Sequence, residues 1–345
     1  MTVAPSPTTP TAPAAERSRA AELDRAVAVL RAAGVPSPEA DAQVLAAAAL
    51  GVPRAHLPLV ASLPADAVGR LRAWVDERAR RVPLQYLVGA PFRHLMLAVG
   101  PGVFVPRPET EVVAGWAIDW ARARAAAVPG EPVRCADLCT GSGAIALALA
   151  TEVPAAVVDA LELEESALGW ARRNRDALDP EPARRVRLHQ ADISDISGLS
   201  NISDSSDLFT ISDIRAGQPD APRELRGRLD LVVANPPYLP EAGPDRLEPE
   251  VAQHDPPRAL WGGPDGLAGP RAVAELARVL LRPGGALVIE HDDSHGASLP
   301  ALLAAAGVWK DIQDHPDLAG RDRFVTATLA GTPGPVGERE ENSDD

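Results

Sequence analysis

The sequence is short of cysteine, aromatic residues, basic residues and long apolar runs, and each shortage excludes something. Its 345 residues include two cysteines, too few to supply a four-ligand zinc site alone and typical of a reducing cytosol. Lysine and arginine number 34 against 48 acidic residues, and the resulting net charge of −14 disfavours binding along a nucleic-acid backbone. No stretch approaches the ~20 apolar residues of a membrane span. We therefore expect a cytoplasmic protein that contacts no membrane and no nucleic acid directly, and that holds no metal ion.

The first part of the chain has a helical pattern. Residues 1–15 are rich in Pro, Thr and Ala, lack the charged start and apolar core of a signal peptide, and are expected to be a disordered head. From 16 to 82, apolar residues recur at helical spacing. Ser37-Pro38 is typical of a helix start and Gly51 of a helix end, and a third helix is expected over Ala65–Arg80. This region is predicted to be a small helical domain.

The remainder of the chain alternates between strand-like and helix-like runs. Residues 83–110, punctuated by Pro and Gly, are interpreted as a hairpin linker, and 111–330 as an α/β domain with a doubly wound, mainly parallel sheet. Within it, 193–226 is a low-complexity stretch that we interpret as a solvated insertion, and 331–345 is expected to be a disordered acidic tail. The predicted strands are Val133–Leu138, Ala156–Leu161, Val186–Gln190, Leu229–Ala234, Ala286–His291 and Arg323–Leu329, and the helices between them include Ala167–Leu178 and Ala272–Leu281.

A glycine-rich loop follows the first predicted strand. It runs from Asp137 to Gly143 and opens a helix, whose amino terminus offers N–H groups to a ligand. Glu162 ends the second strand, where an acid in such folds binds a ribose, and Asp192 ends the third, where it could accept from an adenine amine. Glu164 competes with Glu162, because alternation would place both on the same side of a longer strand. The loop also fits a loose dinucleotide-binding fingerprint.

The quartet Asn235-Pro236-Pro237-Tyr238 follows the fourth predicted strand and should lie in the same crevice. The side-chain carbonyl of Asn235 and a backbone carbonyl can accept the two N–H bonds of a planar NH2 group, and Tyr238 can stack on its plane. The prolines fix φ and remove backbone donors. A plain turn that closes the strand is the alternative for the quartet taken alone. The acids and the glycine loop beside it favour an NH2-binding site.

Together these elements resemble the class I S-adenosylmethionine-dependent methyltransferases that modify exocyclic or amide nitrogens. Three further motifs narrow the resemblance: Pro-Leu-Gln-Tyr-x-x-Gly at 83–89, Val-Pro-Arg-Pro-Glu-Thr-Glu at 105–111 and Ala-Leu-Trp-Gly-Gly-Pro-Asp-Gly-Leu at 259–267. They are similar to motifs of the HemK/PrmC family, the release factor glutamine N5-methyltransferases. The similarity runs from about residue 20 to 329 and implies a seven-stranded sheet, S-adenosylmethionine as the methyl donor, and a helical domain that docks the protein substrate.

The resemblance implies roles for individual residues. Thr140 to Gly143 would hold the methionine end of the donor, Glu162 its ribose, and Asp192 with Ile193 its adenine. Asn235, Pro236, Pro237 and Tyr238 would hold the substrate glutamine, and Asn235, Pro236 and Tyr238 would act in catalysis. The full set implied for the donor is Asp137, Cys139, Thr140, Gly141, Ser142, Gly143, Glu162, Asp192, Ile193 and Asn235.

Three positions depart from the family pattern. Cys139 stands where many members have Gly, so it needs an ordinary backbone conformation or a tolerated strain. Glu162 replaces the commoner Asp, which leaves an acceptor for the ribose. Asp255-Pro256 stands where Glu-Pro is more usual. In addition, the insertion after Asp192 puts the local shape near the adenine in doubt.

The sequence therefore predicts an enzyme, expected to be a monomer, that methylates the glutamine of the Gly-Gly-Gln loop of class I peptide chain release factors. The alternatives are a methyltransferase for another protein glutamine, such as one in a ribosomal protein, or for an exocyclic amine of a nucleic acid. The last would need a basic track, which the net charge disfavours. A binding module that has lost catalysis, and an NAD-dependent dehydrogenase, are more distant readings.

Overall fold

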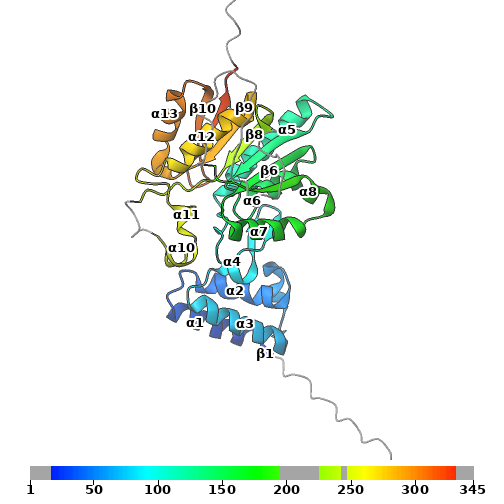
Figure 1. Cartoon of the computed structure of the whole chain (residues 1–345). Helices are drawn as coiled ribbons and strands as arrows, with labels where there is room; N and C mark the ends of the chain where they lie inside the picture. Colours follow the sequence, from blue (N-terminus) through cyan, green and yellow to red (C-terminus); the bar gives the residue numbers. More distant parts are fainter. Residues whose placement is uncertain (1–16, 194–224, 242–246, 332–345) are drawn as a thin grey trace, which may run out of the picture. The chain divides into compact units, whose positions relative to one another are not determined.

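The computed structural model describes residues 17–193, 225–241 and 247–331, and it divides into two compact units, Met1–Gly89 and Ala90–Asp345 (Figure 1). The predicted head, nearly all of the predicted insertion and nearly all of the predicted tail lie outside the described residues. Leu225, which the sequence analysis placed in the insertion, is described and is buried against the core of the second unit.

The first unit is helical. Its core consists of apolar side chains such as Leu30, Leu45 and Leu71, one from each of the three main helices. The second of these helices has Pro38 as its first residue and ends at Gly51, whose φ of 68° is the left-handed conformation that favours glycine. The elements are β1 (Arg17–Ser18), α1 (Arg19–Ala32), α2 (Pro38–Leu50), η1 (Arg54–Leu59), β2 (Ser62–Leu63), α3 (Ala65–Ala79) and α4 (Leu84–Val88).

The boundary between the units falls after α4 and not at residue 82, where the sequence analysis ended the helical domain. The physical reason is apolar packing: Leu84, Leu87 and Val88 lie against the helical core of the first unit. The motif at 83–89 therefore belongs to the first unit, and the hairpin begins at Ala90.

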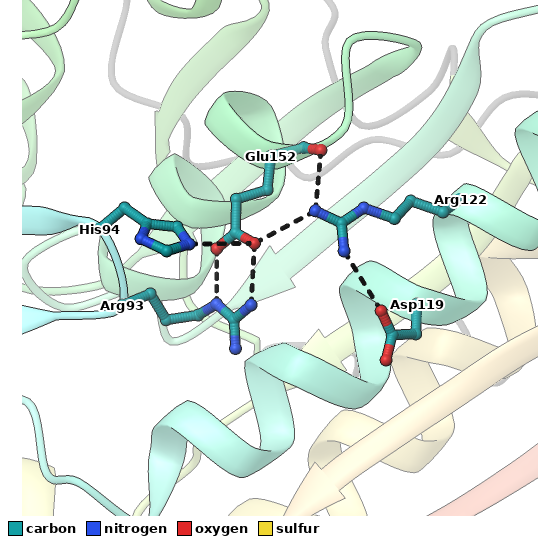
Figure 2. Close-up of polar contacts among 5 residues, drawn as sticks. All are labelled: Arg93, His94, Asp119, Arg122 and Glu152. Atoms are coloured by element: carbon teal, nitrogen blue, oxygen red, sulfur yellow. Dashed lines mark hydrogen bonds and ion pairs between the residues drawn. The ribbon is translucent and has the colours of Figure 1, made fainter.

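The hairpin consists of β3 (Ala90–Phe92) and β4 (Leu95–Leu97), which pair antiparallel. Arg93 in its turn donates two hydrogen bonds to Glu152, of 2.5 and 2.8 Å (Figure 2). Glu152 ends α6 (Ala144–Glu152) and also pairs at 3.3 Å with Arg122 of α5 (Thr110–Ala127). These ion pairs tie the hairpin to the helices of the second unit.

A seven-stranded sheet forms the centre of the second unit. Its strand order is β10-β11-β9-β8-β5-β6-β7, and the strands run parallel except β11, which is antiparallel to both of its neighbours. This confirms the predicted doubly wound, mainly parallel architecture. The strands are β5 (Val133–Leu138), β6 (Ala156–Glu162), β7 (Val186–Gln190), β8 (Leu229–Ala234), β9 (Leu281–Glu290), β10 (Trp309–Pro316) and β11 (Asp322–Leu329).

Helices cover both faces of this sheet. Val232 and Leu287 point to one face and join the core beneath α12 (Ala268–Leu280) and α13 (Ser298–Ala305). Their neighbours along each strand point to the other face, where α5 and α6 pack. The other helices of this unit are α7 (Glu165–Asp176), α8 (Pro180–Arg184), α10 (Pro249–His254), α11 (Pro257–Leu260) and η4 (Asp293–His295). Within the described ranges, no helix combines the length and apolarity that crossing a membrane requires.

Candidate active site

A cavity of about 870 Å³ opens in the second unit, at the edge of the sheet where the parallel strands end. This is the edge at which open α/β sheets bind ligands. The cavity is lined by the loop after β5, the end of β6, the segment after β7, the quartet after β8 and the loop that leads into α5. Four separate strand ends thus bring the predicted site residues to one place.

Asp137 ends β5 and is almost fully buried, at 1% exposure. Its Oδ2 accepts hydrogen bonds from the Thr140 hydroxyl (2.5 Å) and from the backbone N–H of Ala146 (3.0 Å). Its Oδ1 is buried without a partner. Burial raises the pKa of Asp137 to about 7. The side chain lines the cavity, so its unpartnered oxygen is a ready acceptor for a cationic or hydrogen-bonding ligand group.

The loop after Asp137 has a strained residue. Cys139 has a φ of 61°, so this position takes the left-handed conformation and not the ordinary one that a side chain prefers. The backbone N–H of Thr140 donates to the Leu161 carbonyl at 2.9 Å, which fixes the loop to β6. Gly143, with a φ of 86°, caps α6. Of the two possibilities stated for Cys139, the structure has the tolerated strain.

Glu162 and Glu164 lie in different environments. The carboxylate of Glu162 accepts the backbone N–H of Gly141 at 2.8 Å and that of Glu164 at 2.9 Å. Burial raises the pKa of Glu162. The carboxylate of Glu164 pairs instead with Arg258, at 2.9 Å, and its side chain is 42% exposed. Both residues line the cavity, but Glu162 alone is held against the glycine loop.

Asp192 and Ile193 also line the cavity. The sequence analysis expected Asp192 to end the third strand. In the structure β7 ends at Gln190, so Asp192 follows the strand. Ile193 packs against the core beneath α12. The described residues are interrupted after Ile193 and resume at Leu225.

The quartet is divided by the structure. Asn235, Pro237 and Tyr238 line the cavity. Pro236 is buried and is not among the residues that line it. The Nδ2 of Asn235 donates to the Thr110 hydroxyl at 3.2 Å, and the Tyr238 hydroxyl donates to Oε1 of Glu290 at 3.1 Å. Burial raises the pKa of Tyr238 well above its usual range, so the phenol stays protonated.

Sequence reasoning did not assign Thr110 and Glu290. Both line the cavity and are buried, at 3% and 1% exposure. Glu290 ends β9, the neighbour of β8 in the sheet. The signal that could have found it is the one that found Glu162: an acid at the carboxyl end of a parallel strand, on the edge that carries the quartet.

Two of the motifs that had no assigned role support this site. Gly262 and Gly269 pack so closely against the quartet that a Cβ on either would lie 2.7 and 2.5 Å from the Pro237 carbonyl oxygen. Asp255 is buried and pairs with Arg107 at 2.5 Å, so the shorter acid at this position still reaches its partner. These contacts hold the chain on both sides of the cavity.

The strand order, with one antiparallel strand, a glycine loop after β5 and an acid at the end of β6, defines a class I methyltransferase. Enzymes of this class use S-adenosylmethionine as methyl donor. Comparison with known proteins narrows the class to one family. Residues 22–89 match the model of the PrmC N-terminal domain.

About nine tenths of the chain is similar to curated relatives named release factor glutamine methyltransferase. The relative from Streptomyces coelicolor is 46% identical over 314 residues, covering 90% of this chain and 98% of the relative. That from Mycolicibacterium smegmatis is 43% identical over 307 residues, covering 89% and 96%. That from Mycobacterium tuberculosis H37Rv is 41% identical over 330 residues, covering 92% and 96%. The chain belongs to the release factor glutamine methyltransferase family.

Proposed function

We propose that this protein transfers a methyl group from S-adenosylmethionine to the side-chain amide nitrogen (N5) of the glutamine in the Gly-Gly-Gln loop of class I peptide chain release factors. The observation that carries the proposal is similarity over nearly the full length to enzymes named for this reaction. The quartet at the cavity supports it chemically, since Asn235 lines the space that a carboxamide would enter.

The partner follows from the same proposal. A release factor is a protein substrate, and the helical unit, which matches the PrmC N-terminal domain over 22–89, is proposed to dock it. Translation termination takes place in the cytoplasm, so this substrate places the enzyme there. We propose that the enzyme acts as a monomer and contacts the release factor without direct contact to nucleic acid or membrane.

The residues at the cavity fit the donor. The unpartnered Oδ1 of Asp137 can accept from the cationic amino group at the methionine end, beside Thr140 to Gly143. The carboxylate of Glu162, held by two backbone N–H groups, can accept from ribose hydroxyls. Asp192 and Ile193 are proposed to flank the adenine. When bound, S-adenosylmethionine supplies an electrophilic methyl group on a positively charged sulfur.

The chain's own residues orient the acceptor. An amide nitrogen is a poor nucleophile, because its lone pair is delocalised into the carbonyl. In the proposal, the Asn235 side-chain carbonyl and the Pro236 backbone carbonyl accept its two N–H bonds, while the Tyr238 ring packs on the amide plane. Holding an acceptor in line can lower a barrier by up to ~7–11 kcal/mol. The same two oxygens stabilise the positive charge that grows on the nitrogen.

Two alternative substrates remain distinct proposals. Another protein glutamine would fit the same pocket chemistry. A nucleic-acid amine would also present an NH2 group, but it would require a basic track for the phosphate backbone, which a net charge of −14 disfavours. The family to which the chain belongs favours the release factor.

The test is incubation of the full chain with labelled S-adenosylmethionine and a purified class I release factor, followed by mass mapping of the labelled peptide. The expected result is one methyl group on the glutamine of the Gly-Gly-Gln loop, and none on a release factor that carries Ala at that position. Label on ribosomal protein or nucleic acid, with none on this glutamine, would overturn the proposal.

A further inference from the structure

We propose that the turn between β10 and β11, residues 317–321, is a substrate-recognition element. In this proposal, Leu318 and Arg321 contact the part of the release factor that flanks the substrate glutamine. The inference rests on the function proposed above and deepens it, because it names a surface that would distinguish the release factor from other proteins with an accessible glutamine.

The cavity by itself cannot select the Gly-Gly-Gln loop. It takes one carboxamide, and every protein glutamine carries the same group. The two glycines of the loop have no side chains, so they offer only main-chain groups to the enzyme. A glutamine side chain is short, so the main chain on either side of it must lie against the rim of the cavity. Selection therefore has to come from rim residues that reach beyond the glutamine.

The turn lies at the edge of the sheet that carries the cavity. β11 is antiparallel to β9, and Phe324 near the start of β11 pairs with Glu290 at the end of β9. The residues just before β11 therefore lie at the edge where the parallel strands end. Arg321 and Arg323 line the cavity itself. The turn that carries Leu318 is thus joined directly to the cavity wall.

The buried acid Asp317 holds the turn in shape. Its Oδ1 accepts the backbone N–H of Ala319 at 2.8 Å and that of Arg321 at 3.1 Å. Its own backbone N–H donates to the Arg321 carbonyl at 2.7 Å, and its Oδ2 pairs with Arg323 at 3.3 Å. Because these bonds fix the turn before a partner arrives, a contact made by the turn loses little affinity to ordering.

This fixed turn presents one apolar and one cationic side chain to solvent. Leu318 is 96% exposed. Arg321 is also exposed, and no residue that the structure describes pairs with its guanidinium group. A single exposed leucine is common on protein surfaces. Here, however, it lies on a fixed turn at the rim of the cavity, three residues from an unpaired cation in a chain whose net charge is −14.

The two side chains suit the segment that would enter the cavity. Arg321 lines the cavity, so its N–H donors can reach main-chain carbonyl oxygens of the Gly-Gly-Gln loop, which the glycines leave unshielded. Leu318 is not among the residues that line the cavity, so it can pack against an apolar side chain of the release factor beside the loop. Complete removal of a leucine side chain from water corresponds to about 10- to 100-fold in affinity.

The experiment compares methylation of an intact class I release factor by the wild type, Leu318→Ala and Arg321→Ala. Each variant is expected to raise the KM for the release factor by about 10-fold, while kcat stays within about threefold, because neither residue would touch the reacting atoms. The affinity for S-adenosylmethionine, measured by calorimetry, should stay within about threefold. Leu318→Met keeps an apolar side chain and should bring the KM back to within about threefold of the wild type.

Two matched controls make the same kinds of change away from the turn. Met96→Ala removes an exposed apolar side chain from β4, in the hairpin that Arg93 ties to the end of α6. Arg134→Ala removes an exposed guanidinium at the amino end of β5, on the opposite edge of the sheet. Both should keep the wild-type KM. A photoreactive benzoylphenylalanine in place of Leu318 should cross-link the release factor within the residues that flank its Gly-Gly-Gln loop.

The possible failures are separable. A wild-type enzyme that does not methylate the release factor defeats the proposed function, whatever the variants do. With an active wild type, an unchanged KM for either Leu318→Ala or Arg321→Ala overturns the recognition role of the turn. A cross-link that maps far from the loop, or an equal rise in KM for the two controls, also overturns it. So does a lower thermal stability of the turn variants that accounts for their loss of activity, because that result marks a merely structural turn.

Discussion

Glu152 and Glu290 are two buried carboxylates in the same unit with opposite surroundings. The Glu152 side chain is 6% exposed and lies between the guanidinium groups of Arg93 and Arg122 (Figure 2). Hydrogen bonding from Arg93 holds the pKa of Glu152 below its usual value. Glu290 receives a hydrogen bond from the uncharged hydroxyl of Tyr238, its Oε2 is buried without a partner, and burial raises its pKa to about 7.

The difference separates stability from chemistry. Glu152 is fully paired and joins the hairpin to α5 and α6, so its charge is neutralised where it is buried. Glu290 and Asp137 each keep an unpartnered buried oxygen at the cavity, an arrangement that costs folding free energy unless a ligand or function uses it. We infer that the catalytic edge holds its polar groups for the reaction, while the hairpin end holds them for the fold.

The largest expected effect on turnover comes from Asn235→Ala at the catalytic edge. The variant loses the acceptor proposed to orient the substrate amide, so kcat should fall by about 10³-fold. Donor affinity should change far less, because the role proposed for Asn235 is mainly in the transition state. Steady-state kinetics with the release factor and calorimetry with S-adenosylmethionine check both parts. Near-normal turnover would remove Asn235 from the mechanism.

The opposite profile is expected for Glu152→Ala. Arg93 and Arg122 lose their shared partner but keep contact with water, so the free energy of unfolding should fall by about 1–3 kcal/mol. At a temperature where the variant is still folded, kcat should match the wild type. Urea unfolding together with a methylation assay tests this, with Glu165→Ala as the exposed control. A Glu152→Ala variant that is as stable as the wild type but has a lower kcat would contradict the assignment of Glu152 to the fold.

The two carboxylates should also respond to pH with opposite signs. The pKa of Glu290 is higher in the folded state than its ordinary 4.5, so the folded state binds more protons, and stability from this group falls as the pH rises from 4.5 to about 7. The shift corresponds to about 3 kcal/mol. The pKa of Glu152 is lowered, so its contribution is present above 4.5 and lost as the pH falls through the folded value.

Unfolding curves of the wild type, Glu290→Gln and Glu152→Gln at pH 5 and pH 8 measure the pH-dependent contributions of the two carboxylates to stability. The stability advantage of Glu290→Gln over the wild type should grow between the two pH values. The stability advantage of the wild type over Glu152→Gln should stay nearly constant, because the contribution of Glu152 changes only at pH values below 4.5. Parallel behaviour of the two variants would show that the surroundings of the carboxylates do not differ as described.

A smaller effect is expected from Glu162→Gln, which replaces the acid proposed to bind the ribose. Loss of charge-assisted hydrogen bonds should weaken S-adenosylmethionine binding by about 10-fold or more. Glu164→Gln, whose partner is Arg258, should bind the donor nearly as the wild type does. Calorimetry on the two variants compares neighbouring acids directly. The reverse order of affinities would move the ribose role to Glu164.

The smallest effect is expected at Cys139. Replacing it with Gly relieves a left-handed conformation that costs a side chain roughly 1–2 kcal/mol, but it adds freedom to the unfolded chain. The net gain in unfolding free energy should therefore be at most about 1 kcal/mol. Thermal unfolding measures it, with Cys139→Ala as the control that keeps the strain. A destabilised Cys139→Gly would show that the thiol packing outweighs the strain.

Much of the second unit was predictable from periodicity and from strand ends. The strands predicted at 133–138 and 229–234 have the same bounds as β5 and β8 in the structure. The edge strand β10 was not among the predicted strands, because Trp-Lys-Asp-Ile-Gln-Asp-His-Pro has too many polar residues to be recognised as a strand. The same applies to α4: a short helix after Pro83 is recognisable only through what it packs against.

The site was predictable where a residue follows a strand in an expected motif, and not where its role depends on a neighbour. The loop from Asp137, Glu162 and the quartet could be placed at one sheet edge from their positions alone. Thr110 and Glu290 could not be joined to the quartet in advance, because their hydrogen bonds with it come from distant segments that meet only in the folded chain. The strain at Cys139 likewise depends on the close fit of the loop against β6.

The most direct test of the account is a structure of this enzyme with a class I release factor and the demethylated donor. We expect the Asn235 side-chain oxygen to lie at hydrogen-bond distance, about 2.9 Å, from the nitrogen of the substrate glutamine, while its NH2 keeps the hydrogen bond to Thr110. An Asn235 remote from that nitrogen, or one that presents its NH2 to the substrate, would contradict it.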